Sequence, residues 1–214
     1  MPYRLFVPPS YNAQNKYPLV LWLHGAAGRG NDNILQISEG NTLGTHVWTK
    51  PENQTKFPAF VLAPQCPAEK FWAYPRDEQM PEQLRLALEI LDTVEKEFSI
   101  DADRVYVAGQ SMGGEGTWAA LRYAPHRFAA ALPLCGYLTP EETAKLPRIP
   151  VWVFQGEDDP IVPLAHARAF VAALKKAGGE VKYQEYPGLK HQVWEKAFVE
   201  PGLVDWLSAK KRKR

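Results

Sequence analysis

The sequence has few cysteines, no long apolar run and almost no excess of charge of either sign. Its 214 residues include 2 cysteines and carry a formal net charge of +1. Two cysteines are too few for a disulfide scaffold or a cysteine-rich zinc site. The balanced charge gives no reason to expect a nucleic acid or an anionic membrane surface as a partner. No segment approaches the roughly 18 consecutive apolar residues of a membrane-spanning helix.

The first residues also lack the apolar core of a secretory signal peptide. We therefore expect a cytoplasmic protein, or a secreted one whose leader is absent from this chain. The one run of like charge is KKRKR at 210–214. Such tails are usually solvated and frayed, so we expect residues 209–214 to be disordered. Residues 1–208 show no linker-like change in composition and predict a single domain. A monomer is the default expectation, with an oligomer left open.

Short apolar runs alternate with helical patterns along the chain. Continuous runs are typical of strands buried on both faces, as in a parallel sheet. Helical periodicity appears at 84–98, after Pro81, and recurs at 167–174, 193–198 and 203–207. Strands that alternate with helices predict an α/β fold with a mostly parallel central sheet flanked by helices. The expected strands are 18–24, 59–63, 105–108, 128–134 and 151–154, with an alternating, edge-like strand at 181–186.

A serine surrounded by glycines lies between one expected strand and the next helical pattern. Residues 109–113 are GQSMG, which fits the G-x-S-x-G pattern of a nucleophile elbow. The glycines let the strand and the helix pack closely around a strained turn. The helix N-terminus favours negative charge beside Ser111. The alternative is a glycine-rich turn that binds phosphate or serves packing alone.

A serine hydroxyl needs a base within hydrogen-bond distance, and the base needs an orienting acid. Three consecutive acids, 157–159, follow the fifth expected strand, and His191 follows the sixth. Both loops belong at the carboxyl ends of parallel strands, where such residues meet. We expect Asp159 to orient His191, with Asp158 as the alternative, and we expect His191 to be the base for Ser111.

The negative oxygen of a tetrahedral intermediate needs two or more hydrogen-bond donors. The backbone N–H of Met112, directly after the serine, is one candidate. The loop after the first expected strand, HGAAGRGNDN at 24–33, is the expected source of the other. We assign the N–H of Ala26, with Ala27 as the alternative, and expect His24 to help order the loop. The competing interpretation is an ordinary flexible glycine loop.

With these residues assembled, the sequence resembles the α/β-hydrolase superfamily. Within it, the sequence is similar to compact serine esterases of the phospholipase/carboxylesterase and feruloyl-esterase-like group, which includes predicted peptidases and polyhydroxybutyrate-depolymerase-like esterases. The resemblance covers nearly the whole chain. It implies an α/β-hydrolase fold and serine-dependent hydrolysis of carboxylic esters without a metal or cofactor. The matching segments are 3–8, 17–30, 63–67 with Trp72, 109–114, 156–163, and the closing residues His191, Trp194 and 205–207.

The sequence departs from this group at Glu115, where bulkier or apolar residues are common, and its first one or two strands are short. The candidate insertion, 138–148, is too short for a sizeable cap domain and predicts an open, shallow site. Trp72 and Trp194 are the expected walls of that site, although Trp72 suits the buried core equally well. Such a site favours esters with short acyl or aryl groups.

The two cysteines, Cys66 and Cys135, end strands that the usual sheet order separates by about three strand spacings, roughly 14 Å. That distance is too long for a disulfide, so we expect two free thiols. Other functions compatible with the same residues are a thioesterase or a peptidase of the same fold. A non-catalytic binding protein on this fold is the alternative from another class, although such a protein is expected to lose at least one of the three site residues.

Overall fold

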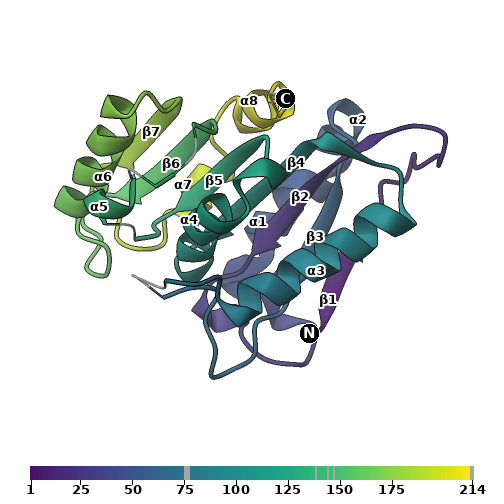
Figure 1. The fold of residues 1–214 in the computed structure, drawn as a ribbon, viewed down its shortest axis with the longest axis horizontal. Helices are drawn as coiled ribbons and strands as arrows, with labels where there is room; N and C mark the ends of the chain where they lie inside the picture. The colour runs from purple at the N-terminus through teal and green to yellow at the C-terminus, as the bar shows by residue number, and fades with distance from the viewer. Residues whose placement is uncertain (75–77, 138, 144, 147, 213–214) are drawn as a thin grey trace.

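A computed structural model describes residues 1–74, 78–137, 139–143, 145–146 and 148–212 of the chain. These residues form one seven-stranded sheet with helices on both faces (Figure 1). In sheet order, the strands are β1 (Tyr3–Phe6), β3 (Phe60–Pro64), β2 (Tyr17–Leu23), β4 (Ile100–Gln110), β5 (Ala130–Leu134), β6 (Val151–Gly156) and β7 (Val181–Tyr186).

The sheet is parallel except at β1, which pairs antiparallel with β3. Strands β2, β3, β5 and β6 are buried along their whole length, because helices cover both faces. Strand β7 lies at the edge and is mostly half-buried, as its alternating sequence predicts. The mostly parallel α/β sheet predicted from the apolar runs is confirmed. Strand β4 begins at Ile100 rather than at residue 105, because its polar first part extends beyond the apolar core.

Helices connect the strands and cover the sheet. The helical patterns at 84–98, 167–174, 193–198 and 203–207 all fall on observed helices. The α-helices are α1 (Thr42–Thr49), α2 (Pro51–Lys56), α3 (Glu82–Glu97), α4 (Met112–Tyr123), α5 (Pro140–Thr143), α6 (Leu164–Lys176), α7 (Trp194–Ala197) and α8 (Leu203–Ser208).

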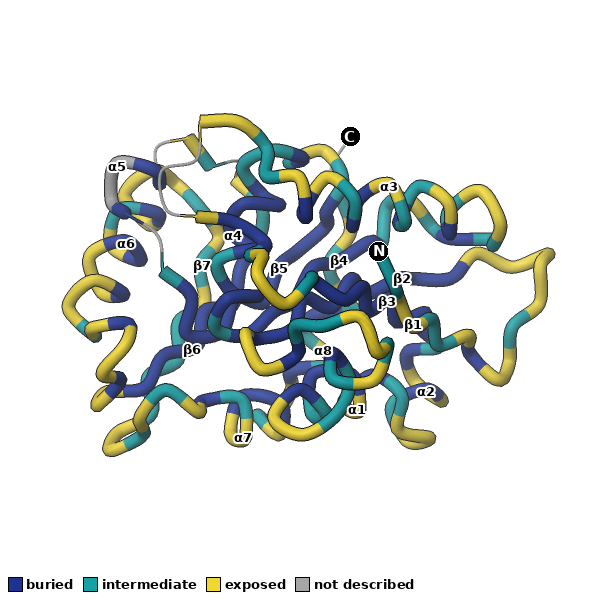
Figure 2. Tube along the Cα trace, turned by 90° about the horizontal axis from the view of Figure 1, so that it is seen from below, coloured by how far each residue is buried: buried dark blue, intermediate teal, exposed yellow. Residues whose placement is uncertain are grey.

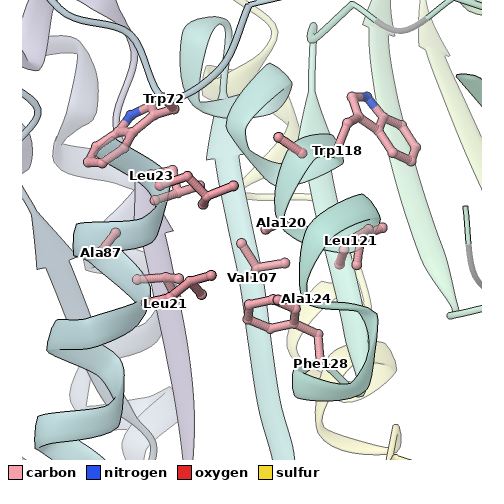
Figure 3. Close-up of a cluster of buried hydrophobic side chains, with 14 of the residues drawn as sticks. Leu21, Leu23, Trp72, Ala87, Val107, Trp118, Ala120, Leu121, Ala124 and Phe128 are labelled. Atoms are coloured by element: carbon pink, nitrogen blue, oxygen red, sulfur yellow. The ribbon is translucent and has the colours of Figure 1, made fainter. Parts of the chain in front are cut away.

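Side chains of the central strands alternate between two apolar layers. Leu21 of β2 and Val107 of β4 face α3, α4 and α6, whereas Trp22 of β2 faces α1, α7 and α8. Figure 3 shows the first layer, with Ala87 of α3 and Ala120 of α4 packed over the strands. Figure 2 shows the strands as a buried band between helices whose outer faces are exposed. The sheet thus provides a rigid base for the loops at its carboxyl edge.

The pair α1 and α2 is absent from the sequence-based prediction. Helix α1 has only eight residues and includes a glycine, Gly44, so its intrinsic helix propensity is low. A Cβ atom at Gly44 would lie 2.1 Å from the Trp22 ring, so the helix packs directly on that indole. Tertiary packing, which no local pattern reveals, therefore stabilises this helix.

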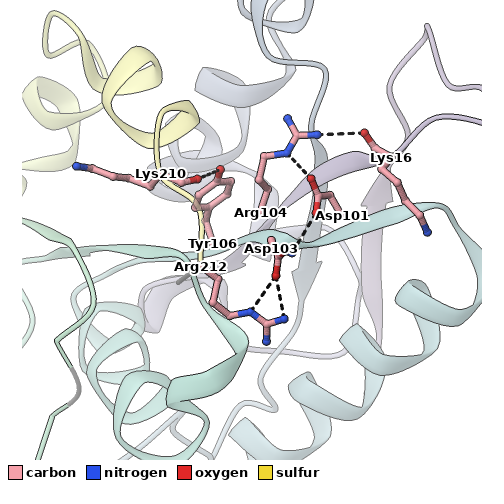
Figure 4. A network of polar contacts seen from close by, with 7 residues as sticks. All are labelled: Lys16, Asp101, Asp103, Arg104, Tyr106, Lys210 and Arg212. Carbon is pink, nitrogen blue, oxygen red and sulfur yellow. Dashed lines mark hydrogen bonds and ion pairs between the residues drawn. The ribbon is translucent and has the colours of Figure 1, made fainter. Parts of the chain in front are cut away.

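The basic C-terminal segment contacts the start of β4 (Figure 4). The Tyr106 hydroxyl donates to the Lys210 carbonyl oxygen at 2.8 Å. The Arg212 N–H donates to the Asp103 carbonyl oxygen at 2.8 Å, and its guanidinium pairs with the Asp103 carboxylate at 3.1 Å. Residues 210–212 thus pack against the sheet rather than fraying as composition alone predicts, because β4 offers partners that a charge count does not reveal. Residues 213–214 lie outside the described residues.

The connection between β5 and β6 carries a single helix of four residues, α5, within its described part, so it forms no sizeable cap domain. Parts of the predicted insertion, residues 138, 144 and 147, lie outside the described residues. Cys66 and Cys135 are buried free thiols, as the strand separation predicts. Across the described ranges, no helix has the length and apolar character needed to span a bilayer, and no three potential metal ligands cluster together.

Candidate active site

The serine turn is a strained connection between β4 and α4. Ser111 has φ 53° and ψ −119°, a conformation that is uncommon for a residue with a side chain. A Cβ atom at Gly109 would lie 2.2 Å from the Gly113 carbonyl oxygen, and one at Gly113 would lie 1.8 Å from the Leu23 carbonyl oxygen. Only glycine fits at these two positions. The close packing places the serine at the carboxyl end of β4 and at the N-terminus of α4.

Three of the predicted residues form a continuous chain of hydrogen bonds. His191 Nε2 lies 2.7 Å from Ser111 Oγ, and His191 Nδ1 lies 2.8 Å from Asp159 Oδ2. The residues follow β4, β6 and β7, so parallel strands bring them to one edge of the sheet. A carboxylate only accepts hydrogen bonds, which assigns the ring proton to Nδ1 and leaves Nε2 free to accept from the serine hydroxyl.

The Asp159 carboxylate is held by neutral donors. Its side chain is completely buried, whereas Asp158 beside it is exposed. Oδ1 accepts from the N–H groups of Ile161 and Val162 at 2.8 and 2.9 Å. Oδ2 accepts from Gln155 Nε2 at 3.1 Å in addition to His191. The structure therefore brings Asp159, and not its neighbour, to the histidine.

Two helices begin beside the serine, and the backbone N–H groups of their first residues are candidate oxyanion donors. Met112 is the first residue of α4, and Ala26 is the first residue of a short 3-10 helix, Ala26–Gly28. The first N–H groups of a helix have no partner within it and point outward as donors. A Cβ atom at Gly25 would lie 3.5 Å from the Gln110 carbonyl oxygen, so this loop lies against the serine turn. Ala26 and Ala27 are both exposed there.

His24 holds the loop from below as a neutral ring. Its Nδ1 donates to the Gly25 carbonyl oxygen at 2.7 Å, and its Nε2 accepts from the Cys66 N–H at 3.0 Å. Burial lowers the pKa of His24 to about 4 and the Arg29 charge acts in the same direction, while the hydrogen bond to Gly25 opposes the shift. The neutral tautomer therefore persists near neutral pH and fixes the peptide that precedes Ala26.

Two buried amides that sequence reasoning missed join this loop to the serine turn. The Gly25 N–H donates to Asn41 Oδ1 at 2.9 Å. Gln110 Nε2 donates to the Gly40 carbonyl oxygen at 2.8 Å and lies 3.3 Å from Asn41 Oδ1. Gln110 occupies the variable position directly before the serine. A polar amide at the end of an otherwise apolar strand was the feature of the sequence that could have pointed to this role.

The two predicted tryptophan walls occupy different environments. Trp72 is completely buried, and its Nε1 donates to the His24 carbonyl oxygen at 3.0 Å. Of the two roles considered for Trp72, this position matches the core. Trp194 is half-buried, with its ring edge-on to His191 at 5.9 Å between centroids, and it lies beside Gly40. Trp194 therefore borders the site, whereas Trp72 supports the loop beneath it.

The α/β-hydrolase class is defined by a mostly parallel sheet and a strained serine turn, with the acid and the histidine on later loops. A family model described as "Putative esterase" matches residues 1–170. The chain belongs to this esterase family.

Individual relatives agree with this assignment. A solved structure described as a thermostable esterase superposes with a TM-score of 0.92 at 39% identity, covering 98% of this chain and 59% of that one. A probable carboxylesterase SOBER1-like protein of Arabidopsis thaliana is 25% identical over 81% of this chain and 72% of its own length. An uncharacterized secreted protein of Arthroderma benhamiae is 24% identical over 82% of this chain. The chain spans 21% of that fungal protein, so some relatives are much longer.

Proposed function

We propose that this chain is a serine carboxylesterase that hydrolyses carboxylic esters through an acyl-enzyme intermediate. The observation that carries the proposal is the unbroken relay from Ser111 Oγ to His191 Nε2 at 2.7 Å and from His191 Nδ1 to Asp159 Oδ2 at 2.8 Å. A buried carboxylate, a correctly oriented imidazole and a hydroxyl at a helix N-terminus are the groups that acyl transfer needs. Membership of the esterase family supports the same reaction.

In the first step, Ser111 Oγ attacks the ester carbonyl carbon while its proton passes to His191 Nε2. Asp159 holds the ring in the required tautomer and stabilises the imidazolium that forms. The carbonyl oxygen becomes an oxyanion, which the backbone N–H groups of Met112 and Ala26 stabilise. Collapse of the tetrahedral intermediate breaks the bond to the leaving alcohol, which takes the proton from His191.

In the second step, a water molecule replaces the alcohol. His191 Nε2 accepts a proton from the water as its oxygen attacks the acyl carbon. The bond to Ser111 Oγ then breaks, and the proton returns to the serine, which releases the carboxylic acid. Each step begins and ends with a neutral imidazole, so His191 carries no net proton from one step to the next.

We further infer one domain over residues 1–208 and an open site that favours short acyl or aryl esters. The continuous sheet from β1 to β7 supports the first inference. The short α5 connection and the half-buried Trp194 ring at the site support the second. An aromatic edge beside the histidine offers apolar contact to an aryl or short alkyl group.

A covalent probe tests the proposal. We expect a fluorophosphonate to add one adduct at Ser111, located by mass spectrometry, and we expect Ser111→Ala to abolish both the adduct and the burst of para-nitrophenol from an acetate ester. Thermal unfolding of the variant is the control for folding. Full ester turnover by Ser111→Ala would refute the assigned nucleophile, and the absence of both labelling and turnover in the natural chain would favour a non-catalytic binding protein.

A further inference from the structure

Glu115 lies one helical turn after the serine on α4. Its N–H donates to the Ser111 carbonyl oxygen at 3.0 Å. Residues four apart on a helix share a face, and their Cα–Cβ bonds tilt toward the N-terminus. The Cα–Cβ bond of Glu115, in the first turn of α4, therefore tilts toward the serine turn.

Close packing on both sides confines this side chain. A Cβ atom at Gly114 would lie 2.9 Å from the Gly136 Cα atom, so the backbone of the β5–β6 connection lies against one side. A Cβ atom at Gly116 would lie 2.6 Å from the Trp72 Cβ atom, so the indole segment lies against the other. Glu115 is half-buried between them. Glu115 thus lies in the first turn of the helix that begins at the carboxyl edge of the sheet, where the serine, the histidine and the acid meet.

The described residues offer this carboxyl no hydrogen-bond donor and no cation. Burial is the one cause that raises the pKa of Glu115, to about 7. The titratable groups on neighbouring segments are the Cys135 thiol, Tyr137 and the His191–Asp159 pair. None of them shifts the pKa of Glu115, whereas burial, followed by the Asp159 and Glu115 charges, raises the pKa of the Cys135 thiol. Partial burial of a carboxyl without a partner is unfavourable. A donor on a bound ester would offset that cost.

We propose that Glu115 is a specificity-determining residue, which accepts a hydrogen bond from a hydroxyl or ammonium group of the ester and disfavours esters that carry a carboxylate. The inference rests on the proposed esterase function. Its basis is the position of an unpartnered, half-buried carboxyl one turn from Ser111, beside any ester whose carbonyl lies at the serine. Hydroxyl and ammonium groups share the donor chemistry, and the experiment separates them by pH.

The test compares four butyrate esters that differ only in the alcohol: propyl, glyceryl, dimethylaminoethyl and carboxymethyl. Initial rates of acid release give kcat/KM for each, and ratios to the propyl ester cancel the ionisation of His191. We expect the glyceryl or the dimethylaminoethyl ester to exceed the propyl ester by about tenfold, the effect of one hydrogen bond. The carboxymethyl ester should fall below the propyl ester by a similar factor.

Two substitutions at Glu115 separate charge from hydrogen bonding. Glu115→Leu should bring all the ratios close to one. Glu115→Gln should retain the preference for glyceryl, because its amide oxygen still accepts, while losing the ammonium preference and the carboxylate penalty. Glu97→Gln, at the exposed end of α3, is the matched control and should leave every ratio unchanged.

The pH dependence distinguishes the two donor groups and excludes a merely structural role. Between about pH 6 and pH 8, ionisation of Glu115 should increase the ammonium preference and the carboxylate penalty in the natural chain. The glyceryl ratio should change less, because a protonated carboxyl still accepts from a hydroxyl, and Glu115→Gln should show no slope for the glyceryl and carboxymethyl esters. If Glu115→Leu turns over the propyl ester with ratios within twofold of the natural chain, the specificity role is overturned and the esterase function remains. If Glu115→Leu fails to fold, the Glu115→Gln ratios decide. Failure of the natural chain to hydrolyse any ester or to react with the fluorophosphonate overturns both proposals.

Discussion

Replacing Asp159 with asparagine removes the charge beside His191 and keeps nearly the same shape. In the natural chain, Asp159 Oδ1 accepts from the N–H groups of Ile161 and Val162, so the amide oxygen of the asparagine should occupy the Oδ1 position. The amide nitrogen then takes the place of Oδ2, where it faces two donors, His191 Nδ1 and Gln155 Nε2. Gln155 Nε2 also donates to the Val162 carbonyl oxygen at 2.8 Å, which holds it in place.

The way to relieve this conflict is a change of tautomer at His191. Its Nδ1 would then accept from Asn Nδ2, and its Nε2 would carry the proton and could no longer take one from Ser111. We expect kcat to fall by about ten-thousandfold, which corresponds to about 5.5 kcal/mol of lost transition-state stabilisation. The unmatched Gln155 donor should lower the free energy of unfolding by roughly 1–3 kcal/mol.

Turnover of para-nitrophenyl acetate and urea unfolding measure the two effects separately. Asp158→Asn is the matched control, since Asp158 is exposed and adjacent, and it should change neither quantity appreciably. A loss of less than tenfold in Asp159→Asn would contradict the tautomer argument. An equal loss in both variants would show that the acidic loop, rather than the hydrogen bond to His191, is what activity requires.

Two further predictions concern the support of the site. The pKa of His24 is about 4 in the folded chain, against an ordinary value of 6.5. The unfolded chain therefore binds the proton first as pH falls. The free energy of unfolding should decrease by about 3 kcal/mol between pH 6.5 and pH 4. Urea unfolding should show this slope in the natural chain but not in His24→Gln, and equal slopes would contradict the assigned neutral ring. Trp72→Phe loses the donor to the His24 carbonyl oxygen and should lower Tm with KM little changed, whereas Trp194→Phe should raise KM at constant Tm. The opposite pattern would reverse the roles of the two indoles.

The apolar runs predicted the sheet well because helices cover both of its faces. Such strands are continuous in hydrophobicity, and each observed strand from β2 to β6 overlaps one of the predicted runs. The pair α1 and α2 escaped prediction because α1 packs on Trp22 through Gly44, a contact between distant parts of the chain. Local periodicity records which face is buried, but not which residue elsewhere makes a weak helix stable.

The candidate site was predictable as a set of residue types in order, and less so as a geometry. Ser111 and His191 followed from a motif and from a loop that holds a single histidine. Asp158 and Asp159 are adjacent and chemically identical, so only the fold decides which carboxylate turns inward. The N–H groups of Ile161 and Val162 make that decision by binding Asp159 Oδ1. Every residue other than proline has a backbone N–H, so residue types do not reveal which N–H groups will bind the carboxylate.

The buried amides of Gln155 and Asn41 support the site without adding charge near the hydrogen-bonded chain of Ser111, His191 and Asp159. A cation beside Asp159 would neutralise the carboxylate and weaken its stabilisation of the His191 imidazolium. A neutral amide donates and accepts at once, so it can fix buried backbone without adding charge. Gln155 does this beneath Asp159, and Asn41 does it where the Gly25 N–H meets Gln110. The negative charge of Asp159 is thus held in place by dipoles and remains available to stabilise the histidine in the proposed transfer of the serine proton.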